Sequence, residues 1–154
     1  MAKPGISTVG ALLGYTTTTA TTKPASYKKL TRINAIGGIN IDVEEIDASA
    51  LEDEIEKSIA GRGTTGGNYT ITVNLTDDTL TEWETLISAY NTVKTNGYLW
   101  METYFPSLSK GVYVVCQPPS KLPQPEVGQN GLLTAEINMT INEYKGWDTA
   151  IIPS

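Results

Sequence analysis

The sequence predicts a mainly β protein, an antiparallel β-sandwich or barrel-like fold with one α-helix at about residues 79–95 and a long projecting loop. Threonine occurs 22 times and phenylalanine once, and threonine suits the half-exposed surface of a sheet. Apolar and polar residues alternate strictly from Tyr69 to Leu75, as expected of a strand with one buried face. Several strands, one helix and several more strands follow in order, which favours a helix packed across a sheet or over an open end.

Length, charge and cysteine content limit the class of protein. A chain of 154 residues most simply forms one domain, residues 1–154, with a core of its own. The formal net charge of −6 argues against a nucleic-acid-binding surface, which needs a basic footprint. Cys116 is the single cysteine and forms no internal disulfide. No signal peptide or membrane-length apolar run occurs, so we expect a protein made in the cytoplasm without a membrane partner.

The first third of the chain contains an arm and three strand candidates. Residues 1–11 are expected to form an extended N-terminal arm. A threonine-rich strand follows over 12–22, and a second strand begins at Tyr27. Alternation over 39–43 predicts a third strand, and its phase slips at Glu44, which indicates a bulge or the end of the strand.

The clearest helix follows the strand over 69–75. Thr79, with Glu82 three residues later, predicts a capping box at its start, and Asn96-Gly97 supplies the stop. Its apolar residues recur at helical spacing and predict one buried stripe. They are Leu80, Trp83, Leu86, Ile87, Tyr90 and Val93.

The last third of the chain predicts three more strands. Two of them, over 98–105 and 111–117, are joined by a short linker. Residues 118–131 hold four prolines and two glycines and predict an exposed loop. A long alternating strand over 132–147 follows. We expect residues 146–154 to form a C-terminal arm.

Charge is unevenly distributed along the chain. Residues 1–41 carry five basic residues and no acidic one, whereas residues 42–56 carry eight of the seventeen carboxylates. This asymmetry indicates that one segment meets the other, within a subunit or between subunits. The basic residues are Lys3, Lys23, Lys28, Lys29 and Arg32, and the acidic ones are Asp42, Glu44, Glu45, Asp47, Glu52, Asp53, Glu54 and Glu56.

The residues offer little for catalysis. Histidine is absent, which excludes Ser-His-Asp and Cys-His catalysis and zinc sites built from histidine and cysteine. Cys116 lies in the apolar stretch VYVVCQ and is expected to be a buried small hydrophobic residue. Counted from Asp42, the acidic stretch lacks the central glycine and the twelfth-position glutamate of an EF-hand loop, although an irregular calcium site stays open. We therefore expect no enzyme and no cofactor, and we assign no metal ligand.

The acidic stretch also carries apolar residues that must pack on something. Isoleucines, a valine and a leucine are threaded through the charges over 39–59. Glycine pairs flank the stretch as hinges, so residues 37–67 are expected to form a projecting acidic loop or hairpin. The residues predicted to contact another subunit are Asp42, Glu44, Glu45, Ile46, Asp47, Leu51, Glu52, Asp53, Lys28, Lys29 and Arg32.

The order of the segments carries a family resemblance. An N-terminal arm and strand lead to IGGINIDVEEIDASALEDEIEKSIAGRG, then to NYTITVNLTDD, the helix LTEWETLISAY and paired C-terminal strands. The run EEIDASALEDEIEKSIAG has the form of an acidic loop before a strand that ends in glycine. In segment order and in this motif, nearly the whole chain resembles the major tail tube protein of long-tailed (siphovirus-type) bacteriophages.

This resemblance implies a structural virion protein that self-assembles without cofactors. Six copies would form a ring, and rings would stack head-to-tail into a hollow tail tube that serves as the conduit for genome delivery. Tape-measure protein and transiting DNA would occupy the lumen, and tail-tip and tail-terminator proteins would contact the tube. The protein would lie in the virion tail after assembly in the cytoplasm of the host bacterium.

Simple physical arguments agree with a ring, and alternatives stay open. Joining sheets between subunits removes exposed sheet edges. Six copies would carry a formal charge of −36, six times −6, and a negative lumen repels phosphate and lets DNA slide. One alternative is a tube protein of a contractile tail or secretion device. Another is a monomeric β-sandwich module that binds carbohydrate or calcium.

Overall fold

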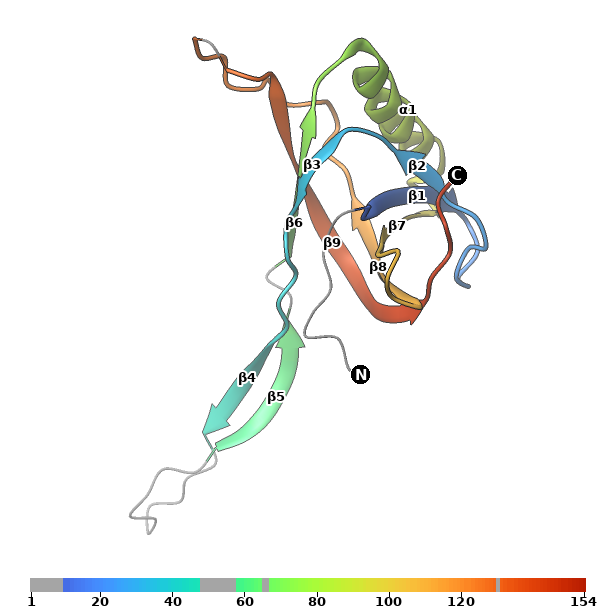
Figure 1. Cartoon of the computed structure of the whole chain (residues 1–154). Coiled ribbons are helices and arrows are strands. Elements are labelled where there is room, and N and C mark those ends of the chain that lie inside the picture. The colour runs from blue at the N-terminus through green and yellow to red at the C-terminus, as the bar shows by residue number, and fades with distance from the viewer. Residues whose placement is uncertain (1–9, 48–57, 65–66, 130) are drawn as a thin grey trace, which may run out of the picture.

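The computed structural model describes residues 10–47, 58–64, 67–129 and 131–154 (Figure 1). Within them a seven-stranded antiparallel sheet carries one helix, and a separate two-stranded hairpin projects from it. This confirms the mainly β fold with a single helix. The elements are β1 (Leu12–Thr18), β2 (Lys28–Leu30), β3 (Ile33–Ile36), β4 (Asp42–Asp47), β5 (Ser58–Thr64), β6 (Asn68–Asn74), α1 (Asp77–Val93), β7 (Tyr98–Tyr104), β8 (Lys110–Gln117) and β9 (Thr134–Thr149).

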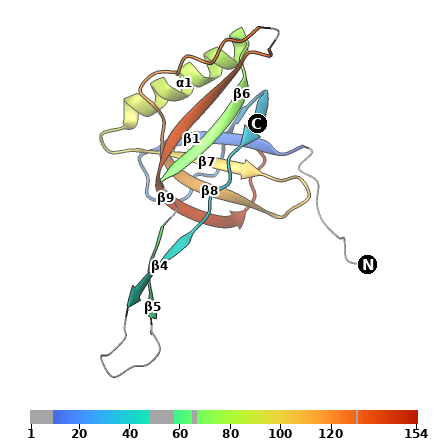
Figure 2. The ribbon, with the colours of Figure 1, turned by 90° about the vertical axis from the view of Figure 1, so that its left-hand side faces the viewer.

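The connection between β2 and β3 makes the sheet curl. The strand order is β2-β1-β7-β8-β9-β6-β3, so these two strands are its opposite edges. Only Thr31 and Arg32 join them in the chain. The three Cα–Cα steps from Leu30 to Ile33 span at most about 11 Å, far less than the width of a flat sheet of seven strands about 4.8 Å apart. The sheet must therefore bend round until its edges approach, which gives a barrel-like body (Figure 2).

Local contacts hold this short link in place. Arg32 has a positive φ of 57°, a conformation that costs an ordinary residue about 1 kcal/mol and that turns the chain sharply. Its carbonyl oxygen accepts a hydrogen bond from the Asn74 amide of β6 at 3.0 Å. The Thr31 hydroxyl donates to the Glu82 carboxylate of α1 at 2.7 Å. The link is thus tied both to the sheet and to the helix.

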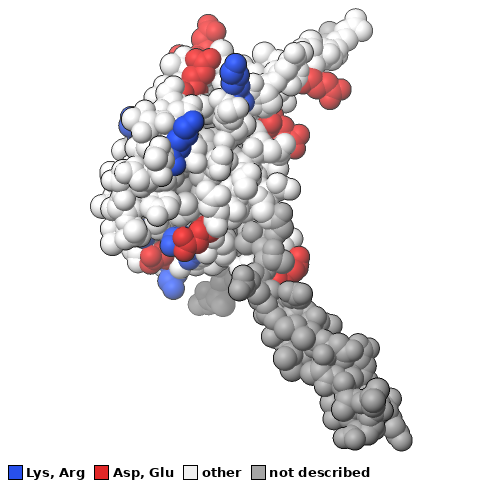
Figure 3. Space-filling view, turned by 180° about the vertical axis from the view of Figure 1, so that it is seen from behind, with Lys and Arg blue, Asp and Glu red and all other residues white. Residues whose placement is uncertain are grey.

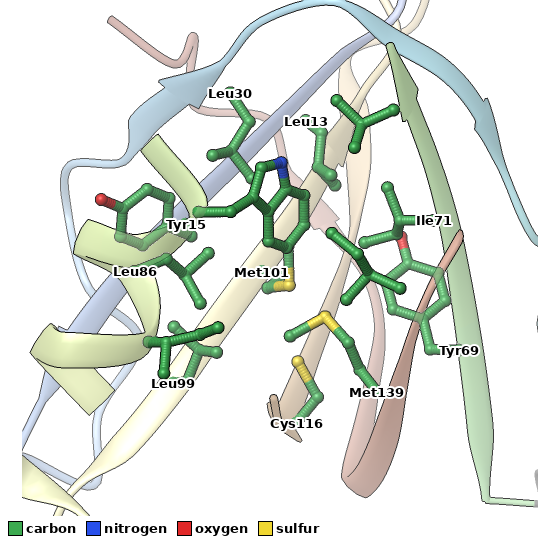
Figure 4. Close-up of a cluster of buried hydrophobic side chains, with 14 of the residues drawn as sticks. Leu13, Tyr15, Leu30, Tyr69, Ile71, Leu86, Leu99, Met101, Cys116 and Met139 are labelled. Carbon is green, nitrogen blue, oxygen red and sulfur yellow. The ribbon is translucent and has the colours of Figure 1, made fainter. Parts of the chain in front are cut away.

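The core fills the inside of the curled sheet. Buried side chains from six of its strands and from α1 form one apolar cluster (Figure 4). On α1 the fully buried apolar residues are Trp83 and Leu86, with Ile87 nearly so, and the helix packs against β1 and β7. Figure 4 shows Leu86 pointing into the cluster beside Leu99 of β7. The predicted helical stripe is therefore the core-facing side of α1, except that its first residue, Leu80, is 39% exposed.

The start of the helix differs from the prediction. The N-cap is Thr76, whose hydroxyl accepts a hydrogen bond from the Thr79 amide, and the Thr79 hydroxyl accepts in return from the Thr76 amide. The capping box is therefore formed by Thr76 and Thr79, and Thr79 does not cap with Glu82. Threonine is favourable at a helix N-cap, so residue type alone allows either Thr76 or Thr79 as the cap. The Glu82 carboxylate instead accepts a hydrogen bond from the Thr31 hydroxyl, which is distant in the chain.

Several strand limits also differ from those expected. β1 ends at Thr18, and the strand predicted from Tyr27 is two strands separated at Arg32. Residues 37–41 are not a strand, because β4 begins only at Asp42. The predicted bulge is confirmed, since the β4–β5 register shifts between Val43 and Glu45. Residues 146–149, expected to begin a C-terminal arm, are the end of β9 and pair with β8, which Gly146 permits through a positive φ of 77°.

Residues 150–154 form a strap across the outer face of the sheet. Pro153 is buried and lies so close to Gly14 of β1 that a side chain at Gly14 would clash with it. Ile151 packs on a second apolar cluster formed by Tyr27, Trp100, Tyr113 and Val115. Ser154 exchanges backbone hydrogen bonds with Tyr27 and Lys29 and so covers the outer edge of β2.

The anchor between the edge link and the helix generates a stability prediction. We expect Glu82→Ala to lower the free energy of unfolding by about 1 kcal/mol, because it removes the hydrogen-bond acceptor of Thr31. Urea unfolding measures this. Glu84→Ala, at an exposed position on the same helix, should change it by less than about 0.5 kcal/mol. Equal effects of the two substitutions would show that the link does not depend on Glu82.

Candidate subunit-contact surface

The β4–β5 hairpin is the most prominent feature outside the barrel. Among the described residues its strands pair only with each other, as a two-stranded sheet separate from the main one. Figures 1 and 2 show it standing clear of the body in both views. A lone two-stranded sheet is marginally stable in water, because it has no second layer to bury its apolar side. The hairpin therefore has the properties of a segment that packs on a partner.

Two glycines fix the root of the hairpin. The Gly37 amide donates to the Thr70 carbonyl oxygen at 2.7 Å, and any side chain at Gly37 would lie 2.9 Å from that oxygen. Gly67 has a positive φ of 82°, which glycine adopts without strain. Its carbonyl oxygen accepts a hydrogen bond from the Ile141 amide of β9. At these two positions the expected glycine hinges are hydrogen-bonded to the main sheet.

An apolar groove lies beside this root. It has a volume of about 600 Å³ and is enclosed by β3 and its extension on one side and by the ends of β7, β8 and β9 on the other. Trp147 is 52% exposed at the groove and stacks on Phe105 with ring centroids 5.8 Å apart. Its apolar lining includes Ile33, Ile36, Ile39, Phe105, Val112, Tyr144 and Trp147. The groove and the hairpin root lie next to each other and together form a broader surface able to bury apolar side chains.

The predicted contact residues fall into two separate groups. Asp42 is exposed at the start of β4, and Glu44, Glu45, Ile46 and Asp47 follow it along that strand. Leu51, Glu52 and Asp53 lie outside the described residues, as do the side chains of residues 43–47. The basic group of Lys28, Lys29 and Arg32 is exposed at β2 and the edge link. Figure 1 shows β2 far from the hairpin, so the structure does not bring the two groups together within one subunit.

The basic group has no acidic partner within the described part of the chain. The ion pairs found there join Lys23 to Asp148 at 3.5 Å and Lys145 to Glu143 at 2.6 Å. On the side seen in Figure 3, charged side chains are scattered over a mostly uncharged surface. Lys28, Lys29 and Arg32 are thus available to a carboxylate-rich segment of another molecule.

Sequence reasoning missed a buried carboxylate under the strap. Glu102 on β7 is fully buried, and its Oε2 accepts hydrogen bonds from the Tyr113 hydroxyl at 2.8 Å and the Ile151 amide at 2.9 Å. Burial, together with the hydrogen bond to Glu102, raises the pKa of the Tyr113 hydroxyl above its ordinary value. Lys23 lies over the Tyr113 ring at 4.1 Å. These groups hold the strap against the sheet.

The thiol of Cys116 and the acidic side chains are the remaining chemically active groups of the described residues. Cys116 is buried as predicted, and burial raises the pKa of its thiol to about 12, so it stays protonated and unreactive at neutral pH. Across the described residues, no cluster of three or more acidic or thiol side chains is arranged to hold a metal ion. No described helix is long and apolar enough to cross a membrane.

Comparison with known proteins links this fold to tail and injection devices. No family model and no curated protein matches the sequence. Among solved structures, a chain of the anti-feeding prophage cap, a tube-terminating cap, matches with TM-score 0.62 and 12% identity over 97% of this chain and 95% of that one. A chain of the sheath–tube complex of the extracellular contractile injection system PVC matches with TM-score 0.58 and 13% identity, over 96% and 94%.

A third similar structure comes from a gene transfer agent. A chain from the tail of the empty particle, which has C6 symmetry, matches with TM-score 0.55 and 13% identity over 90% of this chain and 94% of that one. All three matches span nearly the full length of both chains. At this level of identity they establish a common fold.

The buried carboxylate gives a prediction about the strap. We expect Glu102→Ala to lower the free energy of unfolding by about 2 kcal/mol, because the Ile151 amide and the Tyr113 hydroxyl both lose a buried acceptor. Guanidinium unfolding followed by tryptophan fluorescence measures the loss. Glu136→Ala, at an exposed site on β9, is the control and should cost less than about 0.5 kcal/mol. A Glu102 variant as stable as this control would contradict the role of Glu102 in holding the strap.

Proposed function

We propose that this chain is a structural subunit that self-assembles into rings stacked head-to-tail as a tail-type tube. The observation that carries the proposal is the β4–β5 hairpin, a marginal two-stranded sheet projecting from the curled, barrel-like sheet. In an assembly its apolar side would be buried on a neighbouring subunit. The common fold with chains of a tube cap, a sheath–tube complex and a particle tail supports this use of the barrel.

Charge complementarity supports a contact between different surfaces of two copies. The sequence carries eight carboxylates over 42–56, from the start of β4 onward, and Lys28, Lys29 and Arg32 are exposed at β2 and the edge link, far from the hairpin. A contact between unlike surfaces is heterologous, so it generates rings or helical stacks. The apolar groove around Trp147 adjoins the hairpin root and enlarges the same surface.

The proposed assembly is a hexameric ring. The C6 symmetry of the gene transfer agent tail supports this number of subunits. The lumen would hold a tape-measure protein and transiting DNA, and tail-tip and tail-terminator proteins would bind the tube ends. In this proposal the protein is located in a virion tail, with assembly in the bacterial cytoplasm, and delivers a genome without catalysing a reaction.

A second candidate is a subunit of a contractile injection device, either its tube or the cap that ends the tube. The likeness to the anti-feeding prophage cap and to the PVC sheath–tube complex favours it. Negative-stain electron microscopy of the concentrated protein distinguishes these roles. A tube subunit forms long tubes with a regular axial repeat, whereas a cap forms single rings that do not elongate. Persistent monomers, with or without a tail-tip initiator, would contradict both candidates.

Reversal of the hairpin charges gives a sharper test. We expect Glu44→Lys, Glu45→Lys and Asp47→Lys together to abolish polymerisation, because they place positive charge opposite the basic group of the neighbour. The monomer should keep its circular dichroism spectrum and unfolding midpoint, since β4 lies outside the barrel. Light scattering at matched concentration measures assembly.

The matched control reverses three exposed carboxylates elsewhere. Asp78→Lys, Glu84→Lys and Glu126→Lys change the net charge by the same amount without touching the hairpin. We expect this variant to polymerise. If the hairpin variant polymerises as well as the control, the acidic hairpin is not the interface.

A further inference from the structure

The strap closes the outer edge of β2. The Ser154 amide donates to the Tyr27 carbonyl oxygen at 3.1 Å, and the Ser154 carbonyl oxygen accepts from the Lys29 amide at 3.0 Å. The next outward amide, that of Thr31 just past β2, donates to the Glu82 carboxylate at 3.4 Å. Figure 1 shows the end of the strap beside β2. These outward backbone groups are already bonded, so they do not pair with a further strand.

The strap covers this edge without offering a new one. The residue before Ser154 is Pro153, which has no backbone N–H and cannot donate to another strand. Pro153 is buried against Gly14 of β1, where a Cβ atom would lie 2.9 Å from the proline ring. Sheets in natural proteins use proline and covering segments at their edges to prevent pairing with other chains. The strap is therefore built as a cap and not as an additional strand.

The strap also covers an apolar cluster on the outer face of the sheet. Its residue Ile151 packs on Tyr27, Trp100, Tyr113 and Val115, each of which is at most 4% exposed. A free strand edge beside an exposed apolar patch favours association with another chain. Opening the strap would therefore create an association surface at the sheet edge opposite to the one that leads into the hairpin.

Few polar contacts hold the strap closed. The Ile151 amide donates to Glu102 Oε2 at 2.9 Å, while the buried Glu102 Oε1 has no hydrogen-bond partner among the described residues. The Tyr113 hydroxyl lies 2.8 Å from Glu102 Oε2 and 2.6 Å from the Thr149 carbonyl oxygen, and its single proton cannot fully satisfy both. Ile152 is 68% exposed and adds little packing. A short segment with so few contacts opens locally at a lower free energy than the whole domain unfolds.

We propose that the strap is an autoinhibitory contact, which in its closed position prevents a second copy of this chain from pairing with the β2 edge. The partner strand is β3 of that second copy, because within the described residues no strand pairs with the outer edge of β3. The closed strap restricts association to the hairpin side of the sheet. This inference goes beyond the proposed function and holds whether or not the chain forms tubes.

Opening the strap by substitution tests this autoinhibition. Ile151→Asp places a carboxylate against the apolar cluster and beside the buried Glu102, so we expect it to release the strap. Sedimentation velocity over a concentration series should show this variant associating at least about tenfold more strongly than the unsubstituted chain. Ile152→Asp is the matched control, because it adds the same charge to the same segment at an exposed side chain. It should associate as the unsubstituted chain does.

A second variant opens the strap from the other side. The methyl group added by Gly14→Ala would occupy the space of the Pro153 ring, without changing the charge or the strap itself. We expect it to associate as Ile151→Asp does. Hydrogen exchange at the Lys29 amide reports on the edge directly, because this amide is bonded to the strap. It should exchange faster in both dilute variants than in the unsubstituted chain, and it should become protected again when the variants associate.

Each other outcome contradicts a defined part of the proposal. Unchanged exchange at Lys29 in both variants would show that these substitutions do not open the strap, and fast exchange without association would show that the open edge attracts no second copy. Association without renewed protection of Lys29 would place the contact away from β2. A species that stops at a dimer would exclude β3 as the partner strand, because contacts between unlike edges continue from copy to copy. Global unfolding of both variants, seen by circular dichroism, would show that the strap is an integral part of the fold and not a removable cap.

Discussion

The two-residue link between β2 and β3 is the constraint on which the rest of the structure depends. These strands are the two edge strands of a seven-stranded sheet, so a link this short forces the sheet to curl. Curling creates an enclosed core, and α1 packs against its inner face. The same link explains two otherwise unrelated features, the positive φ of Arg32 and the hydrogen bonds that tie Thr31 to Glu82 of α1.

The curled sheet also determines where association can occur. At one edge, Ser154 covers β2, and Glu102 holds the strap that brings Ser154 there. At the other edge, β3 runs past Gly37 into a hairpin that has no second layer among the described residues of its own subunit. An exposed edge followed by a marginal two-stranded sheet favours pairing with another chain. One side of the barrel is thus closed by its own residues, and the other is open to a neighbour.

Regular local patterns were predictable from the sequence, and contacts between distant residues were not. Strict alternation from Tyr69 to Leu75 and the helical stripe around Trp83 identified β6 and α1 because each pattern reports one buried face. The break at Arg32 has no local signal, since arginine rarely adopts a positive φ. Glu102 was missed because both faces of β7 are buried, and its polar partners come from β8 and the strap. The sequence predicted that the contact residues of the acidic stretch belong to a projecting hairpin. It could not identify the surface that the hairpin contacts, because that surface would lie on another subunit.

The central claim is that the hairpin is completed by a neighbouring subunit. Amide hydrogen exchange, measured by mass spectrometry on dissociated subunits and on assembled protein, tests it most directly, because exchange reports local opening of backbone hydrogen bonds. We expect β4 and β5 to exchange fast in dissociated subunits and to become strongly protected on assembly, while β6 and β9 are protected in both states. Equal protection of β4 and β5 in the two states would contradict it.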